Sequence, residues 1–150
     1  MTFNSLMAAI VVLAATATLA AAEGPRIGQV KTVSGEVEML RDNTRSPVKP
    51  GDPVYAKDIV QTGEHGSVGI SFIDNSLFST GPNSEIAVDE FRFDRATGGE
   101  MVADMRRGTL SVVSGDITKK SPGAVKIKTP TAILAVRGTT FAVEVVGERQ

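Results

Sequence analysis

The sequence VKIKTPTAILAVRGTTFAVEVV, residues 125–146, decides the fold class of this chain. Val125 and Ile127 alternate with lysines, and further along Phe141 and Val143 alternate with a small and an acidic residue. A period of two is typical of β-strands that bury one face and expose the other. The stretch therefore predicts strands that close a β-rich core near the end of the chain.

Arg137, Gly138 and Thr139 interrupt this apolar run with a cation beside a glycine. A guanidinium has five donors and stays charged at any physiological pH, so its burial is costly unless it is paired. We therefore expect a buried clamp from Arg137 to Asp74 or Asp52, or to several turn carbonyls. Gly138 is expected to let another backbone segment approach closely, and Thr139 to hydrogen-bond locally. The alternative is that Arg137 binds an anion or a partner at the surface.

The composition fits one modest globular domain. The chain has 150 residues with 41% hydrophobic content, which is enough for a core of its own. It has no cysteine, which excludes a disulfide framework and a thiolate nucleophile. The formal net charge is -1, with 16 basic and 17 acidic residues, so the charge does not point to nucleic acid or an anionic membrane as partner.

Residues 1–22 are expected to be an export signal and not part of the fold. The segment has no charged side chain, is apolar and rich in alanine, and ends in three alanines before Glu23. This pattern resembles a secretory signal peptide that is cleaved after Ala22, and we expect it to be helical. A membrane-spanning helix needs about 20 apolar residues, so an uncleaved anchor is the alternative. In both cases residues 23–150 are expected to be exported, to the periplasm or beyond the cell.

Between residues 27 and 123, short strand patterns alternate with turn-forming residues. Asp74-Asn75 fits a two-residue hairpin turn because asparagine tolerates a positive φ. The apolar parity changes within residues 85–93, which predicts a bulge near Asp89 and Glu90. The mature chain is therefore expected to be all-β, a sandwich or rolled barrel of many short, mainly antiparallel strands. The side chains expected to be buried are Val68, Ile70, Phe72, Ile86, Val88, Ile127, Ile133, Phe141 and Val143.

Short motifs run in a fixed order from about residue 27 to residue 146. In chain order they are Gly28-Gln29-Val30, Val33-Ser34-Gly35-Glu36-Val37, Gly51-Asp52, Val60-Gln61-Thr62-Gly63, residues 67–73 with Asp74-Asn75-Ser76, Pro82-Asn83-Ser84-Glu85-Ile86, Lys128-Thr129-Pro130 and Val136-Arg137-Gly138-Thr139-Thr140-Phe141. Together they resemble the FecR domain family, the periplasmic regulatory domain known from the ferric-citrate sensor, and the last two motifs are the most specific. The resemblance implies an all-β domain that takes part in protein interactions of the cell envelope, and it implies no catalytic residue.

The sequence departs from the family's sensor proteins in ways that limit what the resemblance implies. Those proteins have a cytoplasmic segment and a transmembrane helix before this domain, whereas this chain starts with an export signal, so an anti-sigma-factor role is not carried over. Asn75 stands where the family often has glycine, within the same turn chemistry. The residues of the family motif, for which we expect a structural role, are Gly51, Asp52, Asp74, Asn75, Thr129, Pro130, Arg137, Gly138 and Thr139.

Patterns for catalysis or metal binding are weak. His65 is the single histidine and lies between glycines in a turn, where it could start a metal site or act as a general base. One histidine without cysteine is a poor ligand set, so we expect an exposed turn histidine. The acidic residues have no calcium-loop spacing, and no Gly-x-Ser-x-Gly elbow is present. We therefore expect no catalytic residue, no metal and no cofactor, and hence no enzyme.

The function class that these observations favour is an exported, non-catalytic protein-interaction or regulatory module of the cell envelope. Its expected partner is another envelope protein that contacts an edge or a face of the sheet. Contact with the membrane is expected only if residues 1–22 are not cleaved. The alternative is a structural or surface-assembly subunit in which exposed edge strands join chains.

Overall fold

The computed structural model describes residues 24–146, in which the regular elements are 12 β-strands and one short helix. The prediction of an all-β fold is confirmed, while the predicted signal peptide, residues 1–22, lies outside the described residues. In chain order the elements are β1 (Arg26–Ser34), β2 (Val37–Arg41), β3 (Thr44–Pro47), β4 (Pro53–Tyr55), β5 (Ile59–Thr62), β6 (Ser67–Phe72), β7 (Leu77–Thr80), β8 (Glu85–Asp94), β9 (Gly98–Val113), α1 (Asp116–Lys120), β10 (Val125–Lys128), β11 (Ile133–Val136) and β12 (Thr140–Val145).

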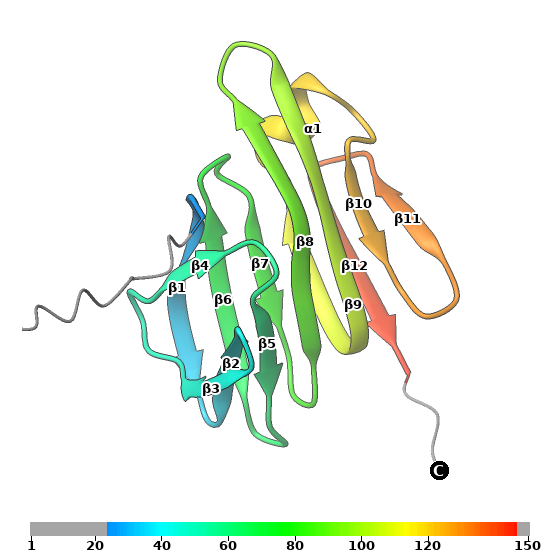
Figure 1. The fold of residues 1–150 in the computed structure, drawn as a ribbon. Coiled ribbons are helices and arrows are strands. Elements are labelled where there is room, and N and C mark those ends of the chain that lie inside the picture. Colours follow the sequence, from blue (N-terminus) through cyan, green and yellow to red (C-terminus); the bar gives the residue numbers. More distant parts are fainter. Residues whose placement is uncertain (1–23, 147–150) are drawn as a thin grey trace, which may run out of the picture.

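The sheet curls so that its two halves face one another, and β9 belongs to both halves (Figure 1). The first part of β9 pairs with β8 on one side and β10 on the other. Its second part pairs with β7 and β12. From β9 one half continues through β8, β5 and β2 to β3, and the other through β7, β6 and β1 to β4. The pairing of β9 with β10 is parallel, and the other described pairings are antiparallel.

The strand β9 changes partners at Gly108. Arg107 pairs with Glu85 of β8, and the next residue, Gly108, pairs with Val145 of β12. Gly108 has a φ of 89°, in the left-handed region that favours glycine. A Cβ atom at this position would also collide with the hydroxyl of Ser84 and lie only 2.5 Å from its Cα. A glycine is therefore required both by the backbone conformation and by the approach of Ser84.

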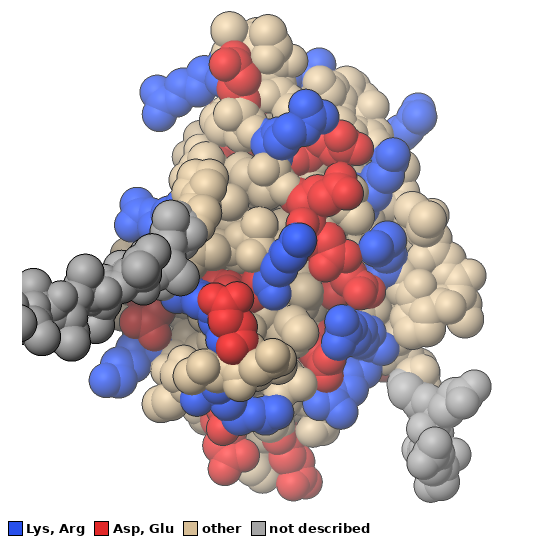
Figure 2. Space-filling model, in the orientation of Figure 1, with Lys and Arg blue, Asp and Glu red and all other residues tan. Residues whose placement is uncertain are grey.

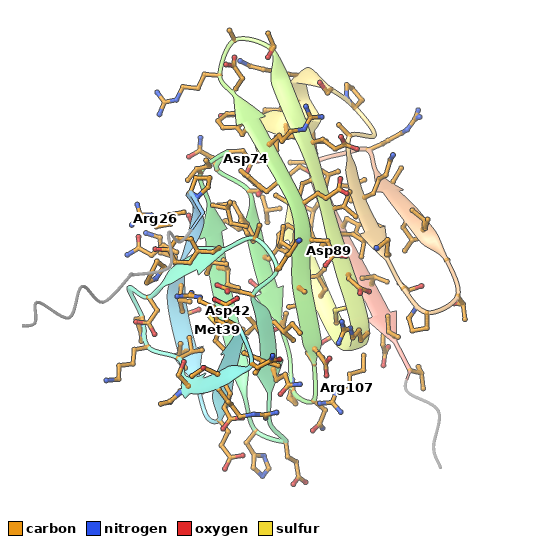
Figure 3. The ribbon with its side chains drawn as sticks, viewed as in Figure 1. Arg26, Met39, Asp42, Asp74, Asp89 and Arg107 are labelled. Atoms are coloured by element: carbon orange, nitrogen blue, oxygen red, sulfur yellow. The ribbon has the colours of Figure 1, made fainter. Side chains whose placement is uncertain are left out.

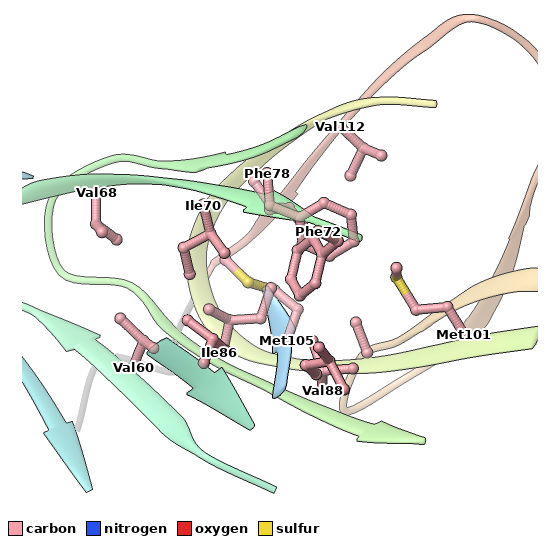
Figure 4. Close-up of a cluster of buried hydrophobic side chains, with 14 of the residues drawn as sticks. Val60, Val68, Ile70, Phe72, Phe78, Ile86, Val88, Met101, Met105 and Val112 are labelled. Atoms are coloured by element: carbon pink, nitrogen blue, oxygen red, sulfur yellow. The ribbon is translucent and has the colours of Figure 1, made fainter. Parts of the chain in front are cut away.

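The core lies between the two halves of the sheet, where aliphatic, aromatic and methionine side chains pack together (Figure 4). Phe72 and Phe78 meet edge to face with ring centroids 4.8 Å apart. The burial prediction is confirmed for Val68, Ile70, Phe72, Ile86, Val88 and Ile127. Phe141 and Val143 are half-buried against the core. The prediction for Ile133 is wrong, because this side chain is 68% exposed. On β11 the inward positions are Leu134 and Val136, so the parity of the expected register was off by one.

The structure tests two local predictions, the hairpin turn after residues 67–73 and the bulge within residues 85–93. The hairpin lies where expected and Asn75 has a φ of 66°, but the loop has three residues, 73–75, and not two, since the N–H of Phe72 donates to the carbonyl of Ser76 over 3.0 Å. The register of β8 against β9 shifts between Val88 and Glu90, which confirms the bulge. The helix α1 was not expected. Among residues 24–146 the structure contains no helix that combines the length and the apolarity needed to cross a bilayer.

Acidic and basic side chains are interspersed over β8, β9 and β10 (Figure 2). Lys128 lies 3.1 Å from Asp89, a residue labelled in Figure 3, and Arg106 lies 2.9 Å from Glu85. The hydrogen bond to Asp89 and its charge raise the pKa of Lys128. Exposed pairs of this kind add little to stability. They give this face balanced charge and leave it without a large patch of one sign.

Candidate functional site

The described part of the sheet has four edge strands, β3, β4, β11 and β12, each with a single described neighbour. Two of them have residues that discourage further pairing: β3 contains Arg45 and Pro47, and β4 begins with Pro53. The strands β11 and β12 contain no proline, and Glu144 is their one charged residue. With six residues, β12 is the longest of the four edges. The edge open to further pairing is therefore at the C-terminal side.

The hydrogen bonding of β9 and β12 shows which groups of β12 face outward. The N–H of Ser114 donates to the carbonyl of Thr139 over 2.8 Å, and on the other side of β9 the N–H of Gly81 donates to the carbonyl of Thr109 over 3.3 Å. Because bonded pairs alternate along an antiparallel ladder, the next residues of β12 bonded to β9 are Phe141, Val143 and Val145. The N–H and C=O groups of the residues between them therefore point away from β9, to the free edge.

An open groove of about 560 Å³ runs between β12 and the turn that joins β10 to β11. Its apolar part includes Leu134, Val143 and Val145, which are half-buried against the core. Arg106 and Glu144 add one charge of each sign. A free strand edge next to an apolar groove is the arrangement by which proteins accept an extended segment as an added strand.

The residues of the predicted family motif do not converge on one site, and each group stabilises its own turn. Gly51 has a φ of 95° and donates its N–H to the carbonyl of Val30 over 2.8 Å. The Oδ2 atom of Asp52 accepts the N–H of Lys49 over 2.8 Å. These contacts hold the loop between β3 and β4 against β1.

Asp74 and Asn75 connect the turn between β6 and β7 to α1. Asp74 is completely buried. Its Oδ1 atom accepts two hydrogen bonds from Ser76, one from the N–H over 3.1 Å and one from the hydroxyl over 2.6 Å. Its backbone carbonyl accepts the N–H of Asp116 over 2.7 Å. The Nδ2 atom of Asn75 donates to the carboxylate of Asp116 over 3.0 Å. The N–H of Ile73 in the same turn donates to the carbonyl of Ile27 over 2.9 Å, so the turn is bonded to β1 as well as to Asp116.

Thr129 and Pro130 form the turn between β10 and β11. The Oγ1 atom of Thr129 accepts the N–H of Ala132 over 3.0 Å, and the N–H of Thr129 donates to the carbonyl of Ala132 over 2.8 Å. Both Thr129 and Pro130 also line the groove beside β12.

The predicted clamp at Arg137 is wrong. The residue is exposed, and within residues 24–146 its guanidinium makes no hydrogen bond or ion pair. It lies in the loop between β11 and β12, directly after the buried Val136, so the parity of the strand directs its side chain outward. Because its guanidinium reaches solvent, Arg137 needs no buried partner for its charge.

The loop between β11 and β12 is held by Ser114 and not by Arg137. The N–H of Ser114 donates to the carbonyl of Thr139 over 2.8 Å, and its hydroxyl donates to the carbonyl of Gly138. The expectation that another segment packs closely on Gly138 is also wrong, because a Cβ atom at this position would find no atom within 4 Å. Its φ of 148° is the observed reason for glycine.

Arg137→Ala is expected to leave the melting temperature unchanged, because the side chain is exposed and unpaired in the described chain. The free energy of unfolding should change by no more than about 0.5 kcal/mol. Thermal unfolding followed by circular dichroism measures this. Val136→Ala is the matched control on the adjacent, buried residue, and it should cost about 1–3 kcal/mol. A loss of similar size in both variants would contradict the described position of Arg137.

A buried guanidinium–carboxylate pair does exist, between Arg41 and Asp58. The Nε atom of Arg41 donates to Asp58 Oδ1 over 2.8 Å and a terminal nitrogen to Oδ2 over 2.7 Å. Asp58 also accepts the N–H of Tyr55 over 2.9 Å, and the guanidinium lies over the ring of Tyr55 at 4.5 Å. The sequence contains no pattern that marks this pair, because Arg41 ends β2 and Asp58 directly precedes β5, 17 positions further along the chain.

His65 is exposed in its turn, as expected. Across residues 24–146, no group of three or more His, Cys, Asp or Glu side chains is placed to hold a metal ion. The site with the most distinctive geometry is therefore the edge of β12 with its groove.

The sequence matches the family described as FecR protein over residues 58–150. A solved structure of a "Cell surface anchoring domain" is similar to the chain at 31% sequence identity, over 43% of this chain and 86% of its own length, with a TM-score of 0.41. No curated protein matches the chain.

Proposed function

The chain belongs to the FecR protein family, as its match over residues 58–150 shows, and we propose that it works as a non-catalytic protein-interaction module of the cell envelope. The export pattern of residues 1–22 supports a location in the periplasm or outside the cell. The observation that carries the proposal is the free edge of β12 beside an apolar groove.

The partner that fits this edge is an extended segment of another envelope protein. It would pair with the outward N–H and C=O groups of β12, which give affinity without regard to sequence. Alternate side chains of the added strand would point to the groove, where Leu134, Val143 and Val145 favour apolar residues. Arg106 and Glu144 would allow a polar residue of either charge beside them.

Ala142→Pro is expected to abolish binding of the partner segment while the domain stays folded. Proline removes the N–H of Ala142, which faces the free edge, and its ring obstructs an added strand. The bonds between β12 and β9 are kept, so the free energy of unfolding should change by less than about 1 kcal/mol. Site-specific photo-crosslinking from Glu144 in the exported protein measures binding, and a discrete adduct with a second protein is expected.

Ala142→Thr is the matched control, because it also changes the exposed side chain but keeps the N–H. It should retain the adduct that Ala142→Pro loses. A crosslinker at Lys126, on the inner strand β10, should give no adduct. Equal adducts from both positions, or an adduct that survives Ala142→Pro, would show that the edge of β12 is not the binding surface.

The alternative is an assembly subunit in which β12 pairs with β12 of a second copy. An antiparallel pairing centred on Val143 would place Ala142 opposite Glu144 of the other copy, so like charges would not face each other. Analytical size exclusion separates the two functions. A monomer over a wide concentration range supports the interaction module, and a dimer that grows with concentration and is lost in Ala142→Pro supports assembly.

A further inference from the structure

A separate cavity of about 270 Å³ lies where the loop between β11 and β12 meets α1. We call it the Arg137 pocket. Two cations, Lys119 and Arg137, and three hydroxyl residues, Ser114, Thr118 and Thr139, line it together with Pro122 and Gly138. No carboxylate of the described residues is part of the lining. The exposed lining is mostly apolar, and the two cations are its charged groups among the described residues.

Arg137 is positioned in this pocket with its donors unused. A Cβ atom at Gly123 would lie 3.5 Å from its Nε atom and 3.6 Å from a terminal nitrogen, so the guanidinium packs over this glycine. Gly123 has a φ of 85°, which favours glycine independently. Packing of the guanidinium on the glycine backbone leaves its N–H edges for a ligand, and this planar fork matches the oxygens of a carboxylate, phosphate or sulfate.

Two other polar side chains of the pocket, Lys119 and Thr118, are also weakly engaged. The Nζ atom of Lys119 is 3.8 Å from the carboxylate of Asp116, at the long end for an ion pair, and its side chain is 69% exposed. The other oxygen of Asp116 already accepts a hydrogen bond from Asn75. The hydroxyl of Thr118 is buried and has no hydrogen-bond partner among the described residues.

The loop that presents Arg137 is held before any ligand arrives. Ser114 binds the carbonyls of both Gly138 and Thr139, which fixes the backbone next to the guanidinium. A pre-formed loop reduces the ordering cost of binding. The side chains of Arg137 and Thr139 are both exposed, so neither is needed to stabilise the core.

We propose that the Arg137 pocket binds an oxyanion group through the guanidinium of Arg137, with Lys119 as a second positive charge. The cavity is larger than a bare anion, so the group would belong to a larger ligand. The pocket does not share lining residues with the groove beside β12, and the inference stands independently of the function proposed for that edge.

Titration of the isotope-labelled exported chain with sodium acetate, phosphate and sulfate, at constant ionic strength, tests the proposal by NMR. Saturable shifts are expected for the Nε–H of Arg137 and the amides of Gly138 and Thr139. Arg137→Gln should weaken the affinity at least about tenfold. Arg26→Gln makes the same change at an exposed residue of β1, on the opposite side of the molecule from β11 (Figure 3), and should keep the affinity.

Saturation by acetate alone would identify a carboxylate as the recognised group, and saturation by phosphate and sulfate alone a tetrahedral anion. The proposal is overturned if no anion gives saturable shifts, or if Arg137→Gln and Arg26→Gln bind equally well. Ala142→Pro should bind the anions like the unaltered chain, so failure at the edge of β12 and failure at this pocket are separate results.

Discussion

Gly108→Ala is expected to destabilise the domain by about 3–5 kcal/mol, the larger of the two stability effects described below. Two costs combine: a left-handed φ for a residue with a Cβ, about 1–3 kcal/mol, and overpacking against Ser84, of similar size. The collision involves the Cα of Ser84 at 2.5 Å, so a rotation of its side chain does not relieve it. Chemical denaturation of the purified chain measures the loss.

Gly51→Ala is the control that separates the two costs. Gly51 also has a positive φ, 95°, but a Cβ there would meet only the Nε2 atom of Gln29 at 3.9 Å. This variant should lose about 1–2 kcal/mol from the backbone conformation alone. If both variants lose the same amount, Ser84 does not press on β9 as described, and the change of partners at Gly108 tolerates a side chain.

Asp58→Ala is expected to cost about 3 kcal/mol. The carboxylate is buried, its side chain being 2% exposed, and it accepts hydrogen bonds from Arg41 and from the N–H of Tyr55. Its removal takes away the buried acceptor of two guanidinium hydrogen bonds and of the Tyr55 N–H, and breaking a pair on its buried side is costly. The melting temperature should fall by roughly 10 °C, as read from calorimetry.

Glu38→Ala supplies the matched control, because Glu38 lies on β2, the strand that contains Arg41. Glu38 pairs with Arg45 over 2.8 Å, but the two side chains are 48% and 54% exposed. A pair so accessible to water is worth about 0–1 kcal/mol. A drop in melting temperature after Glu38→Ala as large as that after Asp58→Ala would contradict the assignment of the buried pair.

The fold class could be predicted because its signals are local. Alternation in residues 67–73 and the Asp74-Asn75 turn depend on neighbours in the sequence, and β6, β7 and their hairpin follow from them. The change of parity in β8 likewise marked its bulge. Ile133 was misplaced because β11 is a short edge strand of four residues, where one face is open and alternation gives little constraint on the register.

The candidate site could be predicted only in part, because charges are paired by long-range packing. Arg137 stood out since it interrupts an apolar run, yet its partners were inferred from the assumption that its neighbours belong to the core. The arginine that does bind a buried carboxylate is Arg41, which ends a strand and looks ordinary in the sequence. The edge of β12 could not be predicted either, because an edge is defined by the absence of a neighbour in the described fold.

The membership of β9 in both halves of the sheet has a consequence for the order in which the chain can fold. Residues 24–97 emerge first during synthesis, and until β9 follows, β7 and β8 each lack a neighbour. Unpaired strands at that stage bind other chains, and pairings between distant segments form slowly. The sheet therefore stays incomplete until residue 113 has emerged, when a single strand supplies the missing neighbour of both β7 and β8.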